Sequence, residues 1–254
     1  MLLYMYRRHL VVCGLLLTLF LYALLLSARG MAAPRFALDK GMDRIAQTNG
    51  SGLRSVSDVL AGRKYAVLTF DDGPYGYGLD ERILQILRKH HAHAVFFLVC
   101  THINDANRHV LGEIESDGNL IGNHGFDHSN LAKLSKTEMT HQVEDCNERI
   151  AQLTGKRPYY FRPSFGSTSA QVTDVVRSFG MKQMLWNANS GDGWLTQPDQ
   201  IRDFSLSEVE DQSIVLLHER PRTAAMLDEL LTKLEERGFQ FELPDPHSGN
   251  AAID

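Results

Sequence analysis

Two short segments of this sequence have the residue types and spacing for chemistry on a bound metal ion. Asp71 and Asp72 are adjacent carboxylates at a Gly73-Pro74 turn, and they repel one another unless a cation lies close. His124 and His128 are separated by three residues, so both imidazoles reach one ion if the segment turns helically. One aspartate would complete a three-ligand set with a position open for water, which is typical of a catalytic zinc-type site.

The ordinary alternatives are a solvated turn at the two aspartates and a hydrogen-bonded pair of surface or core histidines. The aspartate pair directly follows the apolar run 66–70, which ties this turn to a buried strand. The histidine pair alone is a weak signal. Together with the aspartate turn, however, it favours a metal site.

A third segment supplies a candidate acid. His218 ends the apolar run 214–217, where it would donate a proton to a leaving group if a carboxylate such as Asp192 keeps it charged. The alternative is a capped core histidine. A base, an activated water and a separate acid suit hydrolysis of an amide or an ester.

The motifs do not support a serine hydrolase or a dinucleotide-binding protein. The sequence has no Gly-X-Ser-X-Gly segment of the kind that carries a serine nucleophile. The Gly76-Tyr77-Gly78 segment lacks the third glycine of a dinucleotide-binding motif, so it predicts only a turn.

Short apolar runs alternate with amphipathic stretches from residue 65 onward, which predicts parallel strands joined by helical crossovers. Seven strands in this length suit either a small barrel or an open doubly wound sheet, and periodicity does not choose between them. The predicted strands are 65–70, 94–100, 119–123, 158–161, 181–186, 213–217 and 239–243, and the predicted helices include 79–89, 108–116, 136–153, 170–178 and 223–237.

The candidate catalytic residues all lie just beyond the carboxyl end of a predicted strand. In parallel α/β architectures these ends share one face, where functional sites are built, whereas chance would scatter the residues over both faces. The residues concerned are Asp71 and Asp72 after the first strand, His124 and His128 after the third, Arg162 after the fourth, Asp192 after the fifth and His218 after the sixth. In contrast, His90, His91 and His93 precede the second strand and are interpreted as a solvated helix end on the opposite face.

The run Leu10–Leu26 is apolar and uncharged, and Arg7 and Arg8 precede it. This pattern predicts an export signal, cleaved near Ala32 or Ala33, or a retained membrane anchor, and in both cases the rest of the chain faces outward. We therefore expect a periplasmic or other extracytoplasmic protein, secreted or held at the inner membrane.

The predicted organisation is a signal or anchor over 1–33, a linker over 34–64, a catalytic domain over 65–243 and a tail over 244–254. The net charge is −5 for the whole chain and −8 without residues 1–33, which argues against nucleic acid as a partner. Cys146 falls on an apolar helical stripe and is expected in the core, and nothing in the sequence demands that it pair with Cys100.

These residues resemble the five motifs of the NodB-like polysaccharide deacetylases, carbohydrate esterase family four, over roughly residues 65–243. The matching segments are Thr69–Pro74 (TFDDGP), His124–His128 (HGFDH), Arg162–Gly166 (RPSFG), Asp192 with Trp194, and Leu216–His218 (LLH). The resemblance implies an α/β fold, a distorted (β/α) barrel of about seven parallel strands.

The resemblance also implies a role for each matching residue. Asp71 would be the general base and His218 the general acid, with Arg162 orienting Asp71 and Asp192 beside His218. The backbone N–H of Phe165 would help to hold the oxyanion, Leu216 would line the acetyl-methyl pocket, and Trp194 would flank His218. The metal ligands would be Asp72, His124 and His128.

The implied activity is hydrolysis of N-acetyl groups on N-acetylglucosamine units of a cell-envelope glycan, such as peptidoglycan or a chitin-like polymer. We expect zinc as the metal, although cobalt, nickel, iron and manganese suit the same ligands. Two alternatives remain: an O-acetyl esterase on an acetylated glycan, and a non-catalytic glycan-binding relative. Linkage and oligomeric state are left open.

Three positions depart from the family pattern. Gly125 stands where a serine or threonine usually follows the first metal histidine, and Asn189 stands where an aspartate often opens the fourth motif. Gly193 separates Asp192 from Trp194, which are usually adjacent in the family, so we expect this tryptophan to be displaced.

Overall fold

The computed structural model describes residues 62–244 and 252–253, and its main feature is one eight-stranded sheet. The strands are rich in buried apolar residues, as expected for parallel strands that are covered on both faces. The strands are β1 (Lys64–Gly73), β2 (Ala94–Leu98), β3 (Leu120–Asn123), β4 (Tyr160–Phe161), β5 (Lys182–Gln183), β6 (Ala188–Asn189), β7 (Ser213–His218) and β8 (Phe239–Phe241).

The sheet has the order β5-β4-β3-β2-β1-β7-β6, and β8 pairs with the beginning of β1. Every pair of named strands is parallel. β5 and β6 follow one another in the chain but lie at opposite ends of this order, and no pairing between them closes the barrel in the described part. The expected distorted barrel of parallel strands is confirmed, with short β6 as an addition to the seven predicted strands.

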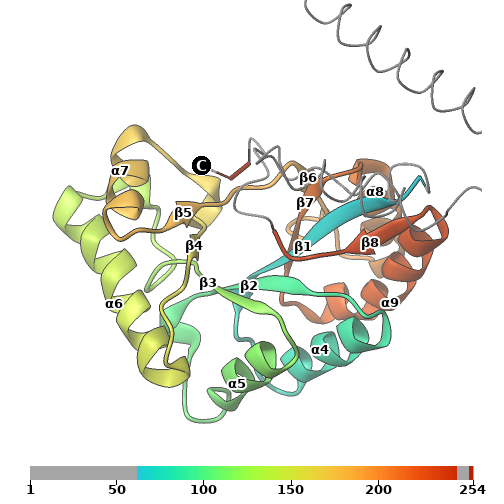
Figure 1. Cartoon of the computed structure of the whole chain (residues 1–254), viewed down its shortest axis with the longest axis horizontal. Coiled ribbons are helices and arrows are strands. Elements are labelled where there is room, and N and C mark those ends of the chain that lie inside the picture. Colours follow the sequence, from blue (N-terminus) through green and yellow to red (C-terminus); the bar gives the residue numbers. More distant parts are fainter. Residues whose placement is uncertain (1–61, 245–251, 254) are drawn as a thin grey trace, which may run out of the picture. The chain divides into compact units, whose positions relative to one another are not determined.

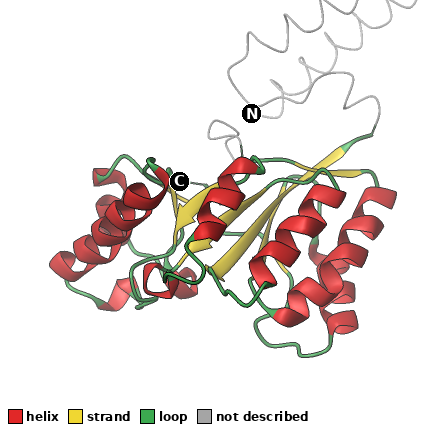
Figure 2. Cartoon of the chain, turned by 90° about the horizontal axis from the view of Figure 1, so that it is seen from below, coloured by secondary structure: helices red, strands yellow, loops and turns green. Residues whose placement is uncertain are grey.

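Helices line the outer side of the sheet. Figure 1 shows α6, α5, α4 and α9 one after another along it, and Figure 2 shows the strands side by side in one layer with the helices packed against them. α9 buries Leu227, Leu230, Leu231 and Leu234 on a single stripe, as its periodicity predicts. The α-helices are α4 (Leu79–Lys89), α5 (His109–Ser116), α6 (Lys136–Thr154), α7 (Ala170–Ser178), α8 (Pro198–Glu208) and α9 (Pro221–Glu236), and the short 3₁₀ turns are η1 (Cys100–His102), η2 (Leu131–Lys133) and η3 (Ser164–Gly166).

The predicted signal or anchor over 1–33 and nearly all of the predicted linker lie outside the described residues. Among the residues that the structure does describe, no helix has the length and apolar character needed to cross a membrane. At the other end, Ile253 forms an antiparallel bridge with Met184, so part of the predicted tail contacts the domain.

Cys100 and Cys146 form a disulfide that joins η1 to α6. Cys146 is buried in the core as predicted, but the pairing itself was not expected from the sequence. The backbone N–H groups of Cys100 and Thr101 donate to the carbonyls of Gly125 and Phe126, between the two predicted metal histidines. The disulfide therefore anchors the segment that carries those histidines.

We expect the double substitution Cys100→Ala and Cys146→Ala to lower the free energy of unfolding by about 2–4 kcal/mol. The crosslink closes a loop across 46 residues, and its loss frees the unfolded chain. Urea denaturation of parent and variant, each with and without dithiothreitol, measures the change. The reductant should destabilise only the parent; quantitative alkylation of both cysteines in the unreduced parent would contradict the disulfide.

Candidate active site

The polar residues predicted at strand ends come together at one edge of the sheet. Asp71 lies opposite His218 in the register of β1 and β7, and the backbone N–H of Arg162 donates to the carbonyl of Asn123 at the end of β3. Asp192 follows β6 rather than β5, and this places it beside β7. The face predicted from the sequence is thus the face where these side chains meet.

Asp72, His124 and His128 can each offer one ligand atom, and these atoms all lie within 4.8 Å of one another. The Oδ1 atom of Asp72 is 3.1 Å from Nε2 of His128 and 3.7 Å from Nε2 of His124. Asp72 and His128 have φ values of 72° and 65°, an uncommon backbone conformation for residues other than glycine. Such local strain is typical of functional sites. We call these three residues the metal site.

The tautomer of His124 shows which of its ring nitrogens is free to bind a metal ion. Its Nδ1 is 2.7 Å from the carbonyl oxygen of Arg162, which only accepts, so Nδ1 carries the proton. The lone pair of Nε2 then faces carboxylate oxygens of Asp71 and Asp72 at 3.5 and 3.7 Å. Burial lowers the pKa of His124 despite these two carboxylates, so a second ring proton is disfavoured. Several lone pairs therefore converge on a point that suits a cation.

The Oδ1 of Asp72 supports the same conclusion, since it is buried and lies near the Nε2 atoms of His124 and His128, which are themselves candidate ligand atoms. Burial opposes ionisation of Asp72, but the neighbouring imidazoles outweigh it and hold the pKa of this carboxyl below its usual range. The donor set of one carboxylate and two imidazoles is that of a catalytic zinc-type site. The hydrogen bond from His124 to a backbone carbonyl is the usual outer-shell arrangement of a metal-binding histidine. These residues fit a divalent metal ion.

Arg162 holds Asp71 in place. Its guanidinium is fully buried and donates to Oδ1 of Asp71 at 2.7 Å, to Thr69 Oγ1 at 2.7 Å and to the carbonyls of Met184 and Leu185. The other carboxylate oxygen of Asp71 faces the metal site. One oxygen is therefore fixed, and the other is placed to accept a proton.

Asp192 supports His218 through two atoms. Its Oδ1 is 2.7 Å from Nδ1 of His218, and its Oδ2 accepts from the backbone N–H of His218 and from the hydroxyl of Thr223, both at 2.7 Å. Burial lowers the pKa of His218, but the hydrogen bond and charge of Asp192 outweigh it, so the net shift is upward. His218 thus keeps its proton to higher pH than a free histidine does.

We expect Asp192→Asn to move the basic limb of the kcat profile toward lower pH. A general acid must be protonated, and without the carboxylate His218 loses its proton at a lower pH, so turnover fails earlier as pH rises. Initial rates between pH 5 and pH 10 measure the limb, with exposed Asp199→Asn as the matched control. A profile for Asp192→Asn that coincides with the parent's would contradict the pairing.

A cavity of about 130 Å³ opens at the metal site. Leu216 and Phe165 are among the residues that line it, and the Phe165 ring lies edge-on to His128 with centroids 4.6 Å apart. The tryptophan that lines it is Trp186, whereas Trp194 is 58% exposed and packs edge-on against Phe204. Trp186 ends the predicted strand 181–186, and the sequence analysis did not identify it as a lining residue.

The structure shows the surroundings of the three positions that depart from the family pattern. Gly125 has φ of 90°, a conformation that a serine or threonine rarely adopts. Gln142 Oε1 instead braces this loop by accepting from the N–H groups of Phe126 and Asp127. Trp194, which follows Gly193, is not among the residues that line the cavity at the metal site. Asn189 accepts from the N–H of Gly191 and shapes the turn before Asp192.

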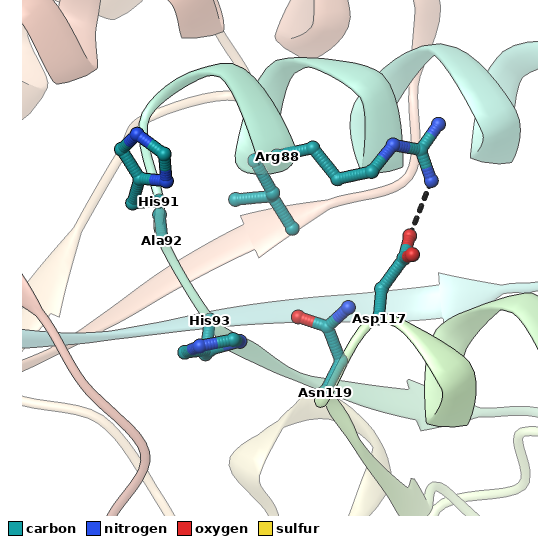
Figure 3. Close-up of a pocket in the computed structure, with 7 residues that line it drawn as sticks. Arg88, His91, Ala92, His93, Asp117 and Asn119 are labelled. Atoms are coloured by element: carbon teal, nitrogen blue, oxygen red, sulfur yellow. Dashed lines mark hydrogen bonds and ion pairs between the residues drawn. The ribbon is translucent and has the colours of Figure 1, made fainter.

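His91 and His93 lie at the other end of the sheet, before the start of β2, and line a separate cavity of about 210 Å³ with Arg88, Asp117 and Asn119 (Figure 3). Both are exposed, as predicted. The prediction that His90 is solvated is wrong, because its side chain is only 5% exposed. Its two ring nitrogens lie 2.9 and 3.0 Å from the carboxylates of Asp228 and Glu235 in α9, so this residue joins α4 to α9 instead of facing solvent.

Comparison with known proteins agrees with this fold. The sequence profile described as "Polysaccharide deacetylase" matches residues 59–184. The solved structure of peptidoglycan deacetylase PdaC from Bacillus subtilis is similar at 30% identity and a TM-score of 0.65, covering 70% of this chain and 87% of that one. This chain belongs to the polysaccharide deacetylase family.

Of two other similar proteins, one is named as a deacetylase and the other is described as a pseudoenzyme. The peptidoglycan-N-acetylglucosamine deacetylase PgdA of Listeria monocytogenes is 31% identical over 179 residues, covering 70% of this chain and 37% of the relative. A structure of BA3943 from Bacillus anthracis, described as a CE4 family pseudoenzyme, is 29% identical with a TM-score of 0.66, covering 70% of this chain and 63% of that one. The chain spans half or less of the first curated relatives that it matches, 50% of the uncharacterized YlxY of Bacillus subtilis and 37% of PgdA.

Proposed function

We propose that this protein is a metal-dependent hydrolase that removes N-acetyl groups from N-acetylglucosamine units of a cell-envelope glycan and releases acetate. The observation that carries the proposal is the combination of three chemical parts within one cavity. These parts are three candidate metal ligands, a carboxylate with one fixed oxygen, and a histidine whose pKa is raised by Asp192. They are the parts that amide hydrolysis requires.

Asp72, His124 and His128 would hold the metal ion, and zinc suits this ligand set. The bound ion would supply Lewis-acid chemistry at the acetamide carbonyl and at the attacking water.

The chain's own groups would then move the protons. Asp71 takes a proton from the attacking water through the oxygen that Arg162 leaves free, and His218 gives a proton to the departing amine. The backbone N–H of Phe165 would donate to the oxyanion, in a turn where φ is 63°. Leu216 would contact the acetyl methyl group at the wall of the cavity. The products are acetate and a free glucosamine unit.

The Cys100–Cys146 disulfide supports an extracytoplasmic location, since disulfides persist in oxidising compartments and are rare in the cytosol. The names of PdaC and PgdA place related proteins on peptidoglycan. We therefore propose that the catalytic domain, residues 65–243, acts outside the cytoplasm, and that residues 1–33 export or anchor it.

A non-catalytic glycan-binding role is the second candidate, because the structurally similar BA3943 is described as a pseudoenzyme. The present chain carries a complete set of base, acid and candidate metal ligands, which favours catalysis.

The test is acetate release from purified peptidoglycan, chitooligosaccharides and acetylated xylan by the zinc-loaded protein. We expect acetate release from peptidoglycan, from chitooligosaccharides or from both, at rates well above the rate with acetylated xylan. Faster release from acetylated xylan would identify an O-acetyl esterase instead, and glycan binding without any acetate release would identify a non-catalytic relative.

A further inference from the structure

The backbone between the two metal histidines forms neither helix nor strand, so its polar groups need partners in other parts of the chain. We call residues 124–128 the histidine loop. The N–H groups of Phe126 and Asp127 both donate to Oε1 of Gln142 in α6, at 2.9 and 3.1 Å. Because both partners are donors, the atom that faces them is the amide oxygen, whose two lone pairs serve two hydrogen bonds. One side chain thus fixes two consecutive peptide groups of the loop.

A second connection between the histidine loop and α6 runs through η1. The backbone N–H of Cys100 donates to the carbonyl of Gly125 at 3.2 Å. The disulfide joins Cys100 to Cys146, which lies one helical turn beyond Gln142 and on the same side of α6. The loop is therefore tied to one stretch of α6 by two routes, directly through the glutamine and indirectly through the disulfide.

Asn123, which directly precedes His124, is fixed to the same helix. It is fully buried, and its Nδ2 donates to the carbonyl of Val143 and to Oδ1 of Asn147, both at 2.9 Å. Its Oδ1 accepts from the backbone N–H of Gly125 at 2.7 Å. The beginning of the histidine loop therefore has an anchor of its own.

The two metal histidines differ in how their rings are held. The ring of His124 is buried, and its Nδ1 donates to the carbonyl of Arg162 at 2.7 Å. The ring of His128 is partly exposed, and its backbone has a positive φ of 65°. Its position therefore depends on the backbone that carries it, and the preceding residue, Asp127, is held by Gln142. Metal–ligand distances vary by only about 0.2 Å, so a small displacement of this backbone is enough to weaken binding.

We propose that Gln142 is a positioning residue for the metal ion, which it affects through His128 without contacting the ion. By holding the peptide groups of Phe126 and Asp127 against α6, it keeps the second metal histidine at the distance from the first that one ion requires. The inference rests on the metal-dependent function proposed above and adds to it a residue outside the metal site. Gly125 has no side chain with which to brace the loop, so this task falls to the helix.

The test is zinc titration of metal-stripped Gln142→Met protein. Methionine keeps the length of the side chain and suits a helix, but it has no amide oxygen, and the position is partly exposed, so the core is spared. We expect the dissociation constant for zinc to rise about 10- to 100-fold, the cost of losing an outer-shell partner. Gln142→Glu keeps an acceptor oxygen at the same reach and should bind zinc like the parent. Gln152→Met, at an exposed glutamine of the same helix, is the matched control.

Zinc affinity requires no turnover, so this inference and the proposed function can fail separately. Weaker zinc binding by Gln142→Met, but not by Gln142→Glu or Gln152→Met, supports the inference even if the parent releases no acetate. Parental zinc affinity in Gln142→Met overturns it even if the parent releases acetate, and a lower urea midpoint of that metal-free variant would then show that Gln142 only stabilises the fold. Equal losses of affinity in Gln142→Met and either other variant, or a parent that binds no zinc, overturn it as well.

Discussion

Asp71→Asn protein is expected to lose turnover by about 10²–10⁴-fold while it still binds one zinc ion. The asparagine keeps the shape of the side chain but cannot take a proton from water. None of the atoms assigned to the metal belongs to Asp71, so zinc affinity should change far less than kcat. Acetate release from chitooligosaccharides gives kcat, and competition with a chromophoric chelator gives zinc affinity.

Removing this charge also deprives fully buried Arg162 of its carboxylate partner, which destabilises the fold. Asp71→Glu keeps the charge but displaces the oxygens, and it is expected to fold and to lose turnover as well. Asp105→Asn, at an exposed aspartate, is the matched control with unchanged kcat. Full activity of zinc-loaded Asp71→Asn protein would refute the role of Asp71 as the base.

His128→Ala is expected to lower zinc affinity by at least about 100-fold, because it removes one of three protein ligands and even outer-shell changes cost 10- to 100-fold. Activity at limiting zinc should fall with occupancy. His128 is partly exposed, so the substitution leaves the core intact, unlike a change at buried His124. Zinc titration of metal-stripped protein measures the affinity directly.

The matched control is His141→Ala on the exposed face of α6, which should bind zinc like the parent. Retention of parental zinc affinity in His128→Ala protein would mean that the metal is held elsewhere. Loss of zinc affinity in both variants would mean that the titration reports general destabilisation.

The sequence predicted the sheet and the face of the site because both follow from local pattern. Parallel strands are apolar along their whole length, and polar residues that follow them must gather at one edge, so Asp72, His124 and His218 could be placed together without coordinates. Periodicity did not distinguish a barrel from an open sheet. The resemblance to the family motifs then predicted the barrel.

The features that sequence patterning missed depend on contacts between distant segments. The pairing of Cys100 with Cys146 requires η1 to lie against α6, and an apolar helical stripe indicates burial without naming a partner. Trp186 appeared as an ordinary strand residue, and its place in the cavity follows from the close approach of Gly166, where an added Cβ would lie 2.6 Å from the indole. His90 looked solvated because its two carboxylate partners lie in α9, more than a hundred residues later.

Acetate and free amine released from N-acetylglucosamine oligomers by metal-stripped protein, titrated with zinc, test the central claim most directly. The account predicts acetate release that rises in proportion to zinc and stops rising at one ion per chain, with one new amine for each acetate. Acetate release independent of zinc would contradict the metal site. The absence of acetate at full zinc occupancy would contradict hydrolysis itself.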